Sequence, residues 1–461
     1  MVAVILAAGL GTRMKSRLPK VLHPILGDPS LLWVLRSLPP RVSRALVVVH
    51  HGKDRVQAAL AGWEAGGLLP CPVQAVDQGE PLGTGHALQA CIPSLDGCGA
   101  ERVLILSGDV PLLPSGRVEA LLDRPAALLA MELENPGSYG RVLLGAAGTL
   151  QGIVEARDLP SGLPEQRLVN GGAYHLPWEG LRQALGRLKA ANAQGEYYLT
   201  DAVTDLAASL PVEVLRGDAS ELAGMNSRRD QAALEALAAE RINMAWMDEG
   251  VSFLDPGSAR IGPRVSLASD VTVEAGVRVE GASAISAGCV LGQGCVLRDC
   301  RIGGDTVLRP YSVLEGAEIG EGCVVGPFAR LREGTRMAPG SHVGNFVETK
   351  QARLGPGVKA NHLSYLGDCE VGEGTNVGAG VITCNYDGFR KHRTVIGKGV
   401  FIGSDSQLVA PVTLGDGAIV GAGTTVTEDV PADALALARA PLTLKDGAAG
   451  RLRARLRSRM G

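Results

Sequence analysis

The sequence contains few aromatic residues and no paired cysteine motif. Aromatic side chains make up only 3% of the 461 residues, although a large globular core normally uses more of them, whereas glycine is abundant at 62 residues. The nine cysteines include no CxxC pair, which argues against a disulfide framework and against a zinc site. Part of the chain is therefore expected to pack from small and aliphatic side chains in a glycine-rich repeat.

A strong net charge and a long apolar stretch are also missing. The net charge is −3, so the composition gives no general reason to expect nucleic-acid or membrane binding. No apolar run reaches the length of a membrane span, and the first residues have neither the charged leader nor the apolar length of a signal peptide. We expect a cytoplasmic protein, and the length of the chain indicates two or three domains.

The first 226 residues alternate apolar stretches with helical patterns. AVILAAG, RALVVVHH, RVLILSGDVP and AALLAMELE are typical of strands buried on both faces, and DRVQAALAGW and GTGHALQACI are typical of helices between them. This alternation predicts an α/β domain with a mostly parallel sheet. Ligands of such sheets bind at the carboxyl ends of the strands, where LAAGLG and SGDVP lie.

The stretch from residue 227 to residue 250 is rich in Ala, Leu and Glu. Ser227 and Asp230 have the spacing of a helix capping box. We therefore expect a linker helix over residues 227–250, between a first domain of residues 1–226 and a second of residues 251–461.

After Asp255 the apolar pattern takes a period of six residues, which neither a helix nor a strand has. Such hexads predict a parallel β-helix, in which each hexad forms a short strand and a turn and three hexads form one coil. An aliphatic side chain points inward from each strand, and small residues permit the turns. The inward positions are Ile261, Leu267, Val273, Val279, Ile285, Leu291, Leu297, Ile302, Leu308, Leu314, Ile319, Val325, Leu331, Met337 and Val343, and after a less regular passage Ile396, Ile402, Leu408, Leu414, Val420 and Val426.

Most cysteines of the second half follow the hexad pattern. Each lies two residues before an inward aliphatic position, which predicts a small buried slot and a structural role. Cys384 does not fit the slot, but nothing beside it resembles the base that a nucleophile needs. The cysteines of the slot are Cys289, Cys295, Cys300, Cys323 and Cys369.

The loop after the first apolar stretch raises the question of which phosphate it holds. A dinucleotide fingerprint needs a third glycine where Met14 stands, and the GKS or GKT of a Walker A loop is absent. Gly9 and Gly11 can still offer backbone N–H groups to an anion, and Arg13 and Lys20 add two cations, which suits a triphosphate. A simple turn with two solvated surface charges is the structural alternative.

Asp109 lies just after another apolar stretch, in SGDVP. A carboxylate at that position suits a Mg²⁺ ion that bridges phosphates, but it could equally cap a helix.

Taken together, short motifs in both halves resemble one family. The first half contains LAAGLGTRM, LPKVLH, PLGTGHA, SGDVP, YGRV, GIVE, NGGAY, YYLTD and GMNSR, in the order found in nucleoside-diphosphate-sugar pyrophosphorylases. The second half adds PFARLREGT, HVGNFVETK, NHLSYLGD, TCNYDG, FIGSDSQLVAP and GAGTTVTEDV. From Val2 to about Lys445 the chain resembles the bacterial bifunctional UDP-N-acetylglucosamine pyrophosphorylase/glucosamine-1-phosphate N-acetyltransferase (GlmU) family.

This resemblance implies a Rossmann-like α/β nucleotide-diphospho-sugar transferase domain followed by a left-handed parallel β-helix. It implies acetyl transfer from acetyl-CoA to glucosamine-1-phosphate, then uridylyl transfer from UTP to N-acetylglucosamine-1-phosphate with release of pyrophosphate. The product would supply precursors of peptidoglycan and lipopolysaccharide. Because the family is trimeric with acetyltransferase sites between chains, the resemblance also implies a homotrimer.

For uridylyl transfer, the resemblance implies catalytic roles for Arg13 and Lys20 at the phosphates and Mg²⁺ ligands at Asp109 and Asn226. The reaction depends on alignment and charge neutralisation and needs no protein nucleophile. The remaining residues implied to bind UTP or the sugar nucleotide are Leu6, Ala7, Ala8, Gly9, Ser107 and Gly108, with Gln78, Gly83 and Thr84 at the uracil and Gly140, Glu155 and Asn170 at the sugar.

For acetyl transfer, the resemblance implies that His362 is the general base that deprotonates the attacking amine, a role that suits the titration range of histidine. The amine attacks the acetyl donor directly, so no acyl-cysteine is required. The implied contacts of glucosamine-1-phosphate are Arg332, Lys350, Tyr365 and Asn376, and those of acetyl-CoA are Ala379, Asn385, Tyr386, Ser404, Ala422 and Arg439. Asn385 and Tyr386 belong to CNYDGFRKHR, which predicts a protruding loop.

Two other functions stay open from the sequence. A monofunctional sugar-1-phosphate nucleotidyltransferase would use the β-helix only for assembly, which Lys350 and His362 argue against. A non-catalytic regulator would need neither site, which Arg13, Lys20 and Asp109 argue against. The tail RLRARLRSRMG departs from the family with five arginines; it could be solvated, contact acidic groups of a neighbouring subunit, or contact coenzyme phosphates.

Overall fold

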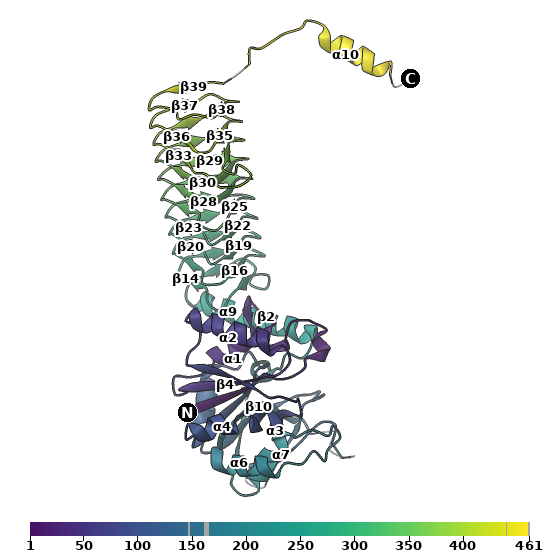
Figure 1. Cartoon of the computed structure of the whole chain (residues 1–461). Helices are drawn as coiled ribbons and strands as arrows, with labels where there is room; N and C mark the ends of the chain where they lie inside the picture. The colour runs from purple at the N-terminus through teal and green to yellow at the C-terminus, as the bar shows by residue number, and fades with distance from the viewer. Residues whose placement is uncertain (146–147, 161–165, 439, 460–461) are drawn as a thin grey trace. The chain divides into compact units, whose positions relative to one another are not determined.

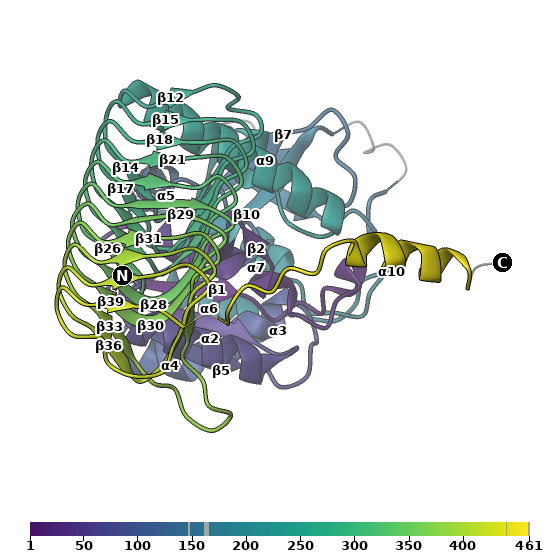
Figure 2. The same cartoon turned by 90° about the horizontal axis from the view of Figure 1, so that it is seen from above.

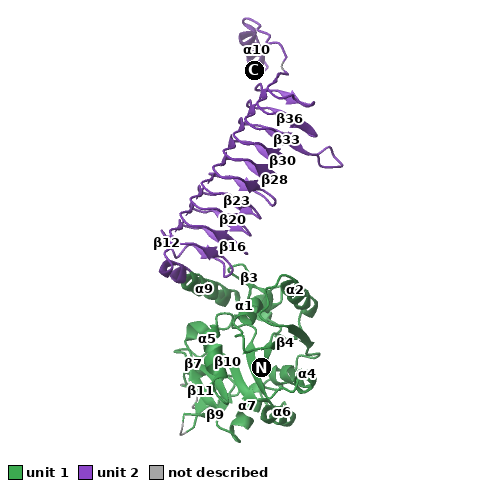
Figure 3. Cartoon of the chain, turned by 90° about the vertical axis from the view of Figure 1, so that its left-hand side faces the viewer, with its two compact units in different colours: residues 1–242 green, residues 243–461 purple. Residues whose placement is uncertain are grey.

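The computed structural model describes residues 1–145, 148–160, 166–438 and 440–459. The chain forms two compact units, residues 1–242 and residues 243–461 (Figures 1 and 3). None of the helices in the described ranges is long and apolar enough to cross a membrane.

The first unit is built on a nine-stranded sheet in the order β11-β7-β10-β6-β1-β4-β5, with β8 paired to β10 and β9 paired to β8. The pairs β4–β5, β1–β4, β1–β6 and β7–β11 are parallel, while β10 runs antiparallel to β6 and β7. The predicted α/β fold with a mostly parallel sheet is therefore confirmed. The strands are β1 Val2–Leu6, β4 Arg44–Val49, β5 Val73–Asp77, β6 Arg102–Ser107, β7 Ala127–Glu132, β8 Arg141–Leu144, β9 Leu150–Val154, β10 Leu168–Pro177 and β11 Glu213–Arg216, besides a small hairpin of β2 Pro24–Ile25 and β3 Asp28–Pro29.

Two hydrophobic cores cover the two faces of this sheet. Alternate residues of β1 point to opposite faces, so Val4 belongs to one core and Ile5 to the other. The first core is completed by α3 Thr84–Gln89, α4 Ile92–Gly97, α6 Trp178–Arg187 and α7 Leu199–Ala207. The second is completed by α1 Ser30–Arg36, α2 Lys53–Ala65, α5 Ser115–Leu122 and α8 Ala219–Leu222. The stretch GTGHALQACI forms not one helix but α3 and the start of α4, with a break at Ala90–Cys91.

The helix predicted after residue 226 is α9, Arg228–Asp248. Its capping box forms as predicted, because the Ser227 N–H donates to Asp230 Oδ2 at 2.8 Å and the Asp230 N–H donates to Ser227 Oγ at 3.3 Å. The N-terminal part of α9 is not a free spacer. Leu234, Ala238 and Ala239 are buried in a third core of the first unit, so they hold α9 against it.

The second unit is a parallel β-helix, as the hexads predict. Figure 2 shows the successive coils from β12 to β39. The register confirms three hexads per coil, since Val273 pairs with Leu291, the inward residue three hexads later. The first sheet comprises β12 Ser252–Phe253, β15 Thr272–Val273, β18 Val290–Leu291, β21 Val307–Leu308, β24 Val324–Val325, β27 His342–Asn345, β29 Lys359–His362, β31 Asn376–Val377, β34 Phe401–Ile402, β37 Ile419–Val420 and β39 Leu435–Ala436.

The other two faces of the prism form one continuous sheet. Beyond the last coil a short helix, α10, spans Ala448–Arg457, and none of its side chains is buried. The strands of the larger sheet are β13 Arg260–Ile261, β14 Ser266–Leu267, β16 Arg278–Glu280, β17 Ala284–Ile285, β19 Val296–Arg298, β20 Arg301–Ile302, β22 Val313–Glu315, β23 Glu318–Ile319, β25 Arg330–Leu331, β26 Arg336–Met337, β28 Glu348–Leu354, β30 Tyr365–Val371, β32 Ile382–Cys384, β33 Thr394–Ile396, β35 Gln407–Val409, β36 Val412–Leu414 and β38 Thr425–Val426.

The cysteines of the hexads fill the predicted buried slots. All five are fully buried, and in other coils the same kind of slot holds a small hydroxyl side chain such as Thr306. Several slot residues donate hydrogen bonds to carbonyls of a neighbouring coil, as Cys323 Sγ does to Ala338 O at 3.3 Å and Thr306 Oγ1 to Gly320 O at 2.8 Å. These side chains therefore satisfy turn carbonyls inside the prism, which is a structural role.

Candidate active sites

The loop after β1 lies at the carboxyl edge of the first unit's sheet. The Ala7 N–H donates to Val48 O at 3.0 Å and the Gly108 N–H to Leu6 O at 2.9 Å, so the neighbouring strands hold the loop. Gly11 has a φ of 59°, and a Cβ there would lie 2.9 Å from Lys20 Cβ. The loop therefore needs glycine at Gly11 to let Lys20 approach.

Met14 stands where a dinucleotide fingerprint has its third glycine. It ends a short 3-10 helix, η1 Thr12–Met14, and its side chain is fully buried in the third core with Ile25 and Leu234. The loop is thus anchored by an apolar side chain, so the motif belongs to a different loop type from the dinucleotide fingerprint.

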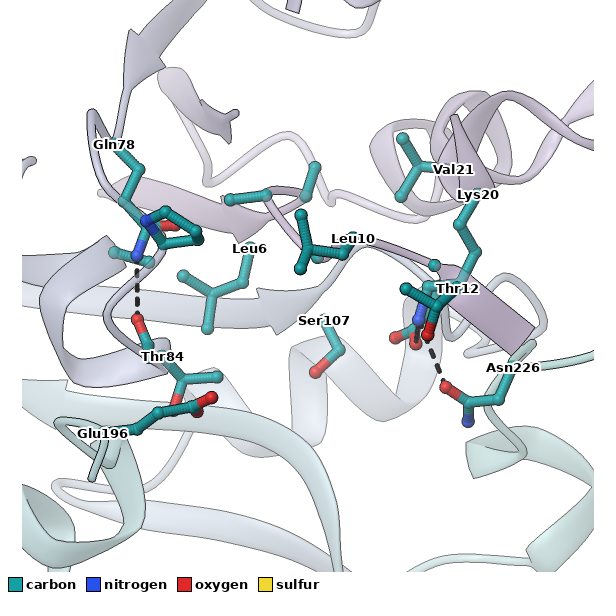
Figure 4. Close-up of a pocket in the computed structure, with 18 of the residues that line it drawn as sticks. Leu6, Leu10, Thr12, Lys20, Val21, Gln78, Thr84, Ser107, Glu196 and Asn226 are labelled. Atoms are coloured by element: carbon teal, nitrogen blue, oxygen red, sulfur yellow. Dashed lines mark hydrogen bonds and ion pairs between the residues drawn. The ribbon is translucent and has the colours of Figure 1, made fainter. Parts of the chain in front are cut away.

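A cavity of about 490 Å³ opens beside this loop (Figure 4). It brings together most residues that the sequence places around UTP: Leu6, Ala7, Ala8, Gly9, Arg13, Lys20, Gln78, Gly83, Thr84, Ser107, Asp109 and Asn226. Gly108 does not line it and instead supports the loop from behind. Sequence reasoning missed Gln194 and Glu196, which also line the cavity and precede the YYLTD motif.

A polar cluster occupies one end of the cavity. Lys20 Nζ donates to Asp109 Oδ2 at 2.5 Å and to Asn226 Oδ1 at 3.2 Å (Figure 4). The two oxygens come from elements more than a hundred residues apart, yet both converge on one cation. Lys20 itself begins a second 3-10 helix, η2 Lys20–Leu22, whose Val21 and Leu22 are buried and thereby fix its base.

The Lys20 ammonium marks a place where a metal cation fits. A carboxylate and an amide oxygen are hard ligands of the kind that Mg²⁺ prefers. Within the described residues no three His, Cys, Asp or Glu side chains gather to form a protein cage for a metal. Mg²⁺ characteristically takes one or two carboxylates and fills its remaining positions with water and substrate phosphates, so this donor set fits it.

The opposite end of the cavity carries neutral polar groups. Gln78 is buried, and its Nε2 donates to Gly83 O at 2.9 Å and lies 3.3 Å from His86 Nδ1. Thr84 Oγ1 accepts a hydrogen bond from the Leu199 N–H at 3.0 Å. Gly83 has a φ of 112°, and a Cβ there would lie 2.6 Å from the Tyr197 carbonyl oxygen. This end presents a fixed amide and backbone groups, which suits a nucleobase edge rather than a phosphate.

Gly140, Glu155 and Asn170 do not line the cavity, but they lie together. The Asn170 N–H donates to Gly140 O at 2.9 Å, and a Cβ on Gly140 would lie 3.4 Å from Glu155 Oε1. Burial raises the pKa of the Glu155 carboxyl, while a hydrogen bond from Thr200 opposes that shift. Asn170 Oδ1 accepts from the Gly172 N–H, and the Gly172 carbonyl in turn accepts from Ser107 Oγ of the cavity wall. The group is therefore linked to the cavity through Ser107.

In the second unit, His362 is exposed at the end of β29. Its Nδ1 lies 2.6 Å from Oδ1 of Asn345, which occupies the matching position one coil earlier. An amide oxygen only accepts, so Nδ1 donates in this hydrogen bond. In the neutral imidazole, Nε2 is then the nitrogen with the free lone pair.

Cationic side chains lie on the adjoining sheet. Arg332 forms an ion pair with Glu348 at 2.9 Å. The neighbouring Lys391 ammonium, and then Arg332, lower the pKa of Lys350. The structure places the Lys391 ammonium beside that of Lys350. Cations held this close attract an anion such as a phosphate.

Tyr365 and Asn385 lie beside Gly367, the residue that pairs with Lys350, whereas Asn376 lies on the first sheet. Tyr365 follows Glu348 by one coil, and Asn376 follows Lys359 by one coil on the first sheet. Asn385 is buried, and its Nδ2 donates to Asp368 Oδ2 at 2.5 Å. Gly367, one coil below Lys350, has no room for a side chain, since a Cβ would lie 2.4 Å from the Tyr365 hydroxyl oxygen. The Tyr365 hydroxyl and the Asn385 amide therefore occupy the space over Gly367, next to Lys350.

A loop of residues 385–392 leaves the prism here, as its polar sequence predicts. Asp387 organises it: Oδ1 accepts the N–H groups of Phe389 and Arg390, and Oδ2 accepts from His392 Nε2 at 2.7 Å. The Arg390 N–H, then His392, lower the pKa of the Asp387 carboxyl far below its usual range. Tyr386 is exposed at the base of the loop. Hydrogen bonds within the loop therefore define its conformation.

Ala379, Ser404 and Ala422 stand in one column. Each follows a first-sheet strand by two residues, and the Asp405 N–H donates to Ala379 O as the Gly423 N–H does to Ser404 O. His362 holds the same position in the coil before Ala379. Arg439 lies outside the described residues. The structure thus aligns His362 with a column of small residues on the following coils.

Known proteins similar in sequence to this chain cover both of its units. Residues 3–164 match the MobA-like NTP transferase domain, and residues 393–428 match the bacterial transferase hexapeptide, six repeats. The Bifunctional protein GlmU of Alkalilimnicola ehrlichii is 47% identical over 95% of this chain and 93% of its own length. The Bifunctional protein GlmU of Nitratidesulfovibrio vulgaris is 45% identical over 95% of this chain and 96% of its own. A solved UDP-glucose pyrophosphorylase complexed with UDP-glucose is 17% identical over 52% of this chain, with a TM-score of 0.43.

Proposed function

Because this chain belongs to the GlmU family of bifunctional proteins, we propose that it makes UDP-N-acetylglucosamine in two steps at two separate sites. Residues 251–461 acetylate glucosamine-1-phosphate, residues 1–226 join the product to UMP, and 227–250 link them. The sequence similarity to GlmU proteins covers 95% of the chain, and the structure has two separate clusters of polar side chains, one around Lys20 and one around His362. This combination is the observation that supports both steps. A β-helix used only for assembly would need neither a free imidazole nor the Lys350–Lys391 cation pair.

In the acetyl-transfer step, the amine of glucosamine-1-phosphate attacks the carbonyl carbon of acetyl-CoA. His362 Nε2 takes the proton of the amine, the new C–N bond forms, and the C–S bond breaks to release coenzyme A. The proton then neutralises the leaving thiolate. Asn345 supports the step because its oxygen holds the proton on Nδ1 and so leaves Nε2 basic.

The other groups of this site position the two substrates. Lys350, Arg332 and Lys391 bind the sugar phosphate, and Tyr365 and Asn376 contact the sugar. The column of Ala379, Ser404 and Ala422, with Asn385, Tyr386 and Arg439, binds the acetyl donor.

In the uridylyl-transfer step, a phosphate oxygen of N-acetylglucosamine-1-phosphate attacks the α-phosphorus of UTP, and the bond to pyrophosphate breaks. Arg13 and Lys20 neutralise the charge that builds on the phosphates. Gln78, Gly83 and Thr84 hold the uracil, and Gly140, Glu155 and Asn170 hold the sugar. We propose that Asp109 and Asn226 hold Mg²⁺, which when bound supplies further neutralisation of phosphate charge.

The same proposal covers assembly and location. The hexapeptide repeats support an oligomer, and we propose a homotrimer. Its substrates UTP and acetyl-CoA, and the unpaired thiols throughout the described residues, support a cytoplasmic enzyme.

The test combines one mixture with one variant. The chain is incubated with glucosamine-1-phosphate, acetyl-CoA, UTP and Mg²⁺, and product masses are measured. UDP-N-acetylglucosamine should appear only when both donors are present. His362→Ala should reduce acetyl transfer by about 10²–10⁴-fold and leave uridylyl transfer unchanged, whereas His51→Ala, an exposed histidine of the other unit, should affect neither. Equal loss of both activities in folded His362→Ala protein would refute the two-site proposal.

A further inference from the structure

The helix α10 (Figure 1) carries charge and apolar surface that neither proposed reaction uses. All arginines and leucines of this helix are exposed, and so is Arg459 just after it. Residues 448–461 contain five arginines and no acidic residue, so this segment carries a charge of +5. The whole chain carries −3, so the other residues together carry −8. A strongly basic segment therefore follows a net acidic body.

The sequence of α10 places leucine between arginines on the helix surface. Leu452 and Leu456 lie one turn apart and form an apolar stripe, with exposed fractions of 57% and 51%. An α-helix turns by about 100° per residue. The four arginines of the helix therefore divide evenly over the two flanks of the stripe, Arg451 and Arg455 on one side and Arg453 and Arg457 on the other.

The described part of the chain provides no acidic partner for these arginines. Arg451 Nη2 donates to the Asp446 carbonyl oxygen at 3.1 Å, and the other three guanidinium groups form no hydrogen bond or ion pair with a described residue. An isolated helix of ten residues is marginally stable in water, and Gly450 in its interior weakens it further. Such a helix is normally stabilised by packing its apolar stripe on another surface, so the features of α10 call for a partner.

The composition of α10 selects the kind of partner. Arginines on both flanks of a leucine stripe suit a surface that is anionic outside and apolar beneath, as a bilayer with anionic lipids is. A nucleic acid would pair its phosphates with the arginines, but it would leave Leu452 and Leu456 unused. The helix also has no aromatic, Asn or Gln side chain that could stack on bases or read them.

We infer that α10 docks on the surface of a bilayer that contains anionic lipids, with the helix axis in the plane of the interface. Leu452 and Leu456 enter the boundary between headgroups and acyl chains, and the flanking guanidinium groups bind lipid phosphates. Each arginine near such a surface strengthens binding by about fivefold, so four of them contribute on the order of 10³-fold. Because only two leucines enter the bilayer, the docking is reversible.

The segment before α10 allows a net acidic body to tolerate this docking. Residues 440–447 are exposed and form no helix or strand. Eight extended residues reach about 27 Å, whereas charges in physiological salt act over about 8 Å. The rest of the chain can therefore stay beyond the range of the lipid charge while α10 is bound. The docking rests on neither proposed reaction, and its failure would leave both proposals standing.

The test measures vesicle binding by the full-length chain in co-sedimentation. At about 0.1 M NaCl, the chain should bind vesicles of equal parts phosphatidylglycerol and phosphatidylcholine at least about tenfold more tightly than vesicles of phosphatidylcholine alone. Raising NaCl to about 0.5 M should weaken the binding. Arg453→Gln/Arg455→Gln/Arg457→Gln should bind the mixed vesicles at least about tenfold more weakly than the wild type.

A matched control removes the same number of arginines elsewhere. Arg182→Gln/Arg187→Gln/Arg216→Gln takes three exposed arginines from the first unit and should bind the mixed vesicles as the wild type does. Hydrogen exchange of the full-length chain gives a second measurement. The amides of residues 451–459 should exchange more slowly with the mixed vesicles than with phosphatidylcholine vesicles, because the helix is stabilised only on an anionic surface.

The apolar stripe is tested by Leu452→Ser/Leu456→Ser, which keeps every arginine. This variant should also bind the mixed vesicles at least about tenfold more weakly, because the leucines no longer enter the bilayer. Deletion of residues 448–461 should abolish vesicle binding and leave both transfer activities unchanged. All of these positions lie outside the cores of the two units, so the circular dichroism spectrum should stay close to that of the wild type.

Vesicle binding that survives the arginine substitutions or the deletion would overturn the inference. Unchanged binding by Leu452→Ser/Leu456→Ser would also overturn it, because charge alone, as on a nucleic acid, would then hold the helix. A wild type that does not bind the mixed vesicles would refute bilayer docking directly. In that case, a raised KM for acetyl-CoA in the deletion variant would assign the arginines to coenzyme phosphates, and weaker self-association in sedimentation velocity would assign them to a neighbouring copy.

Discussion

Lys20, which we propose to bind the substrate phosphates, also occupies the proposed metal position, and this gives a sharp prediction for Lys20→Met. In the structure its ammonium is the partner of Asp109, and both side chains are largely shielded, with exposed fractions of 13% and 21%. Removing the ammonium leaves the carboxylate without its cation, which costs about 1–3 kcal/mol of folding free energy. The melting temperature of the first unit should therefore fall by roughly 2–10 °C in metal-free buffer.

The same variant should respond more strongly to Mg²⁺ than the wild type. In the wild type, Mg²⁺ must displace the ammonium from Asp109 and Asn226, whereas in Lys20→Met it does not. Because a ligand stabilises a folded protein according to its affinity, millimolar Mg²⁺ should raise the melting temperature of Lys20→Met more than that of the wild type. Uridylyl transfer should nevertheless fall by about 10²–10³-fold, since a phosphate contact is lost.

Thermal shift against Mg²⁺ concentration, combined with separate assays of the two activities, checks this reasoning. Lys53→Met is the matched control, because Lys53 also pairs with an aspartate, Asp77, at 2.7 Å, but on the exposed surface. That variant should change stability, Mg²⁺ response and activity little. Equal Mg²⁺ shifts in wild type and Lys20→Met would show that Lys20 and the metal do not share the oxygens of Asp109 and Asn226.

Two further predictions concern the second unit. Because Lys391 and Arg332 lower the pKa of Lys350, this lysine loses its charge at a lower pH than an ordinary lysine. The KM for glucosamine-1-phosphate should therefore rise as the pH becomes alkaline, and Lys391→Met should move that rise to higher pH. Steady-state kinetics across a pH series will measure both effects. Burial raises the pKa of Cys295 to about 11 and that of Cys369 to about 12. In folded protein at pH 8, iodoacetamide should therefore modify these two thiols at least about 100-fold more slowly than the exposed Cys98. Peptide mass mapping will measure the rates, and rapid modification would contradict the packing of both cysteines in the prism.

The features that the sequence predicts well are those that repeat locally. The hexads specify inward residues, coil length and the buried cysteine slots, because each strand pairs with an equivalent strand one coil away. The α/β pattern and the capping box of Ser227 and Asp230 are local in the same sense. Most residues that line the cavity beside the β1 loop could also be foreseen, since they lie in short contiguous motifs that resemble those of a known family.

Tertiary structure alone decided the features that join distant segments. Nothing in the sequence near Met14 shows that it is buried against α9, or that Gln194 and Glu196 reach the cavity. The proximity of Lys350 to Lys391 depends on where the loop of residues 385–392 returns to the prism. The physical reason is that periodicity records which side chains point inward, whereas a contact across the fold depends on the path of the whole backbone between its two partners.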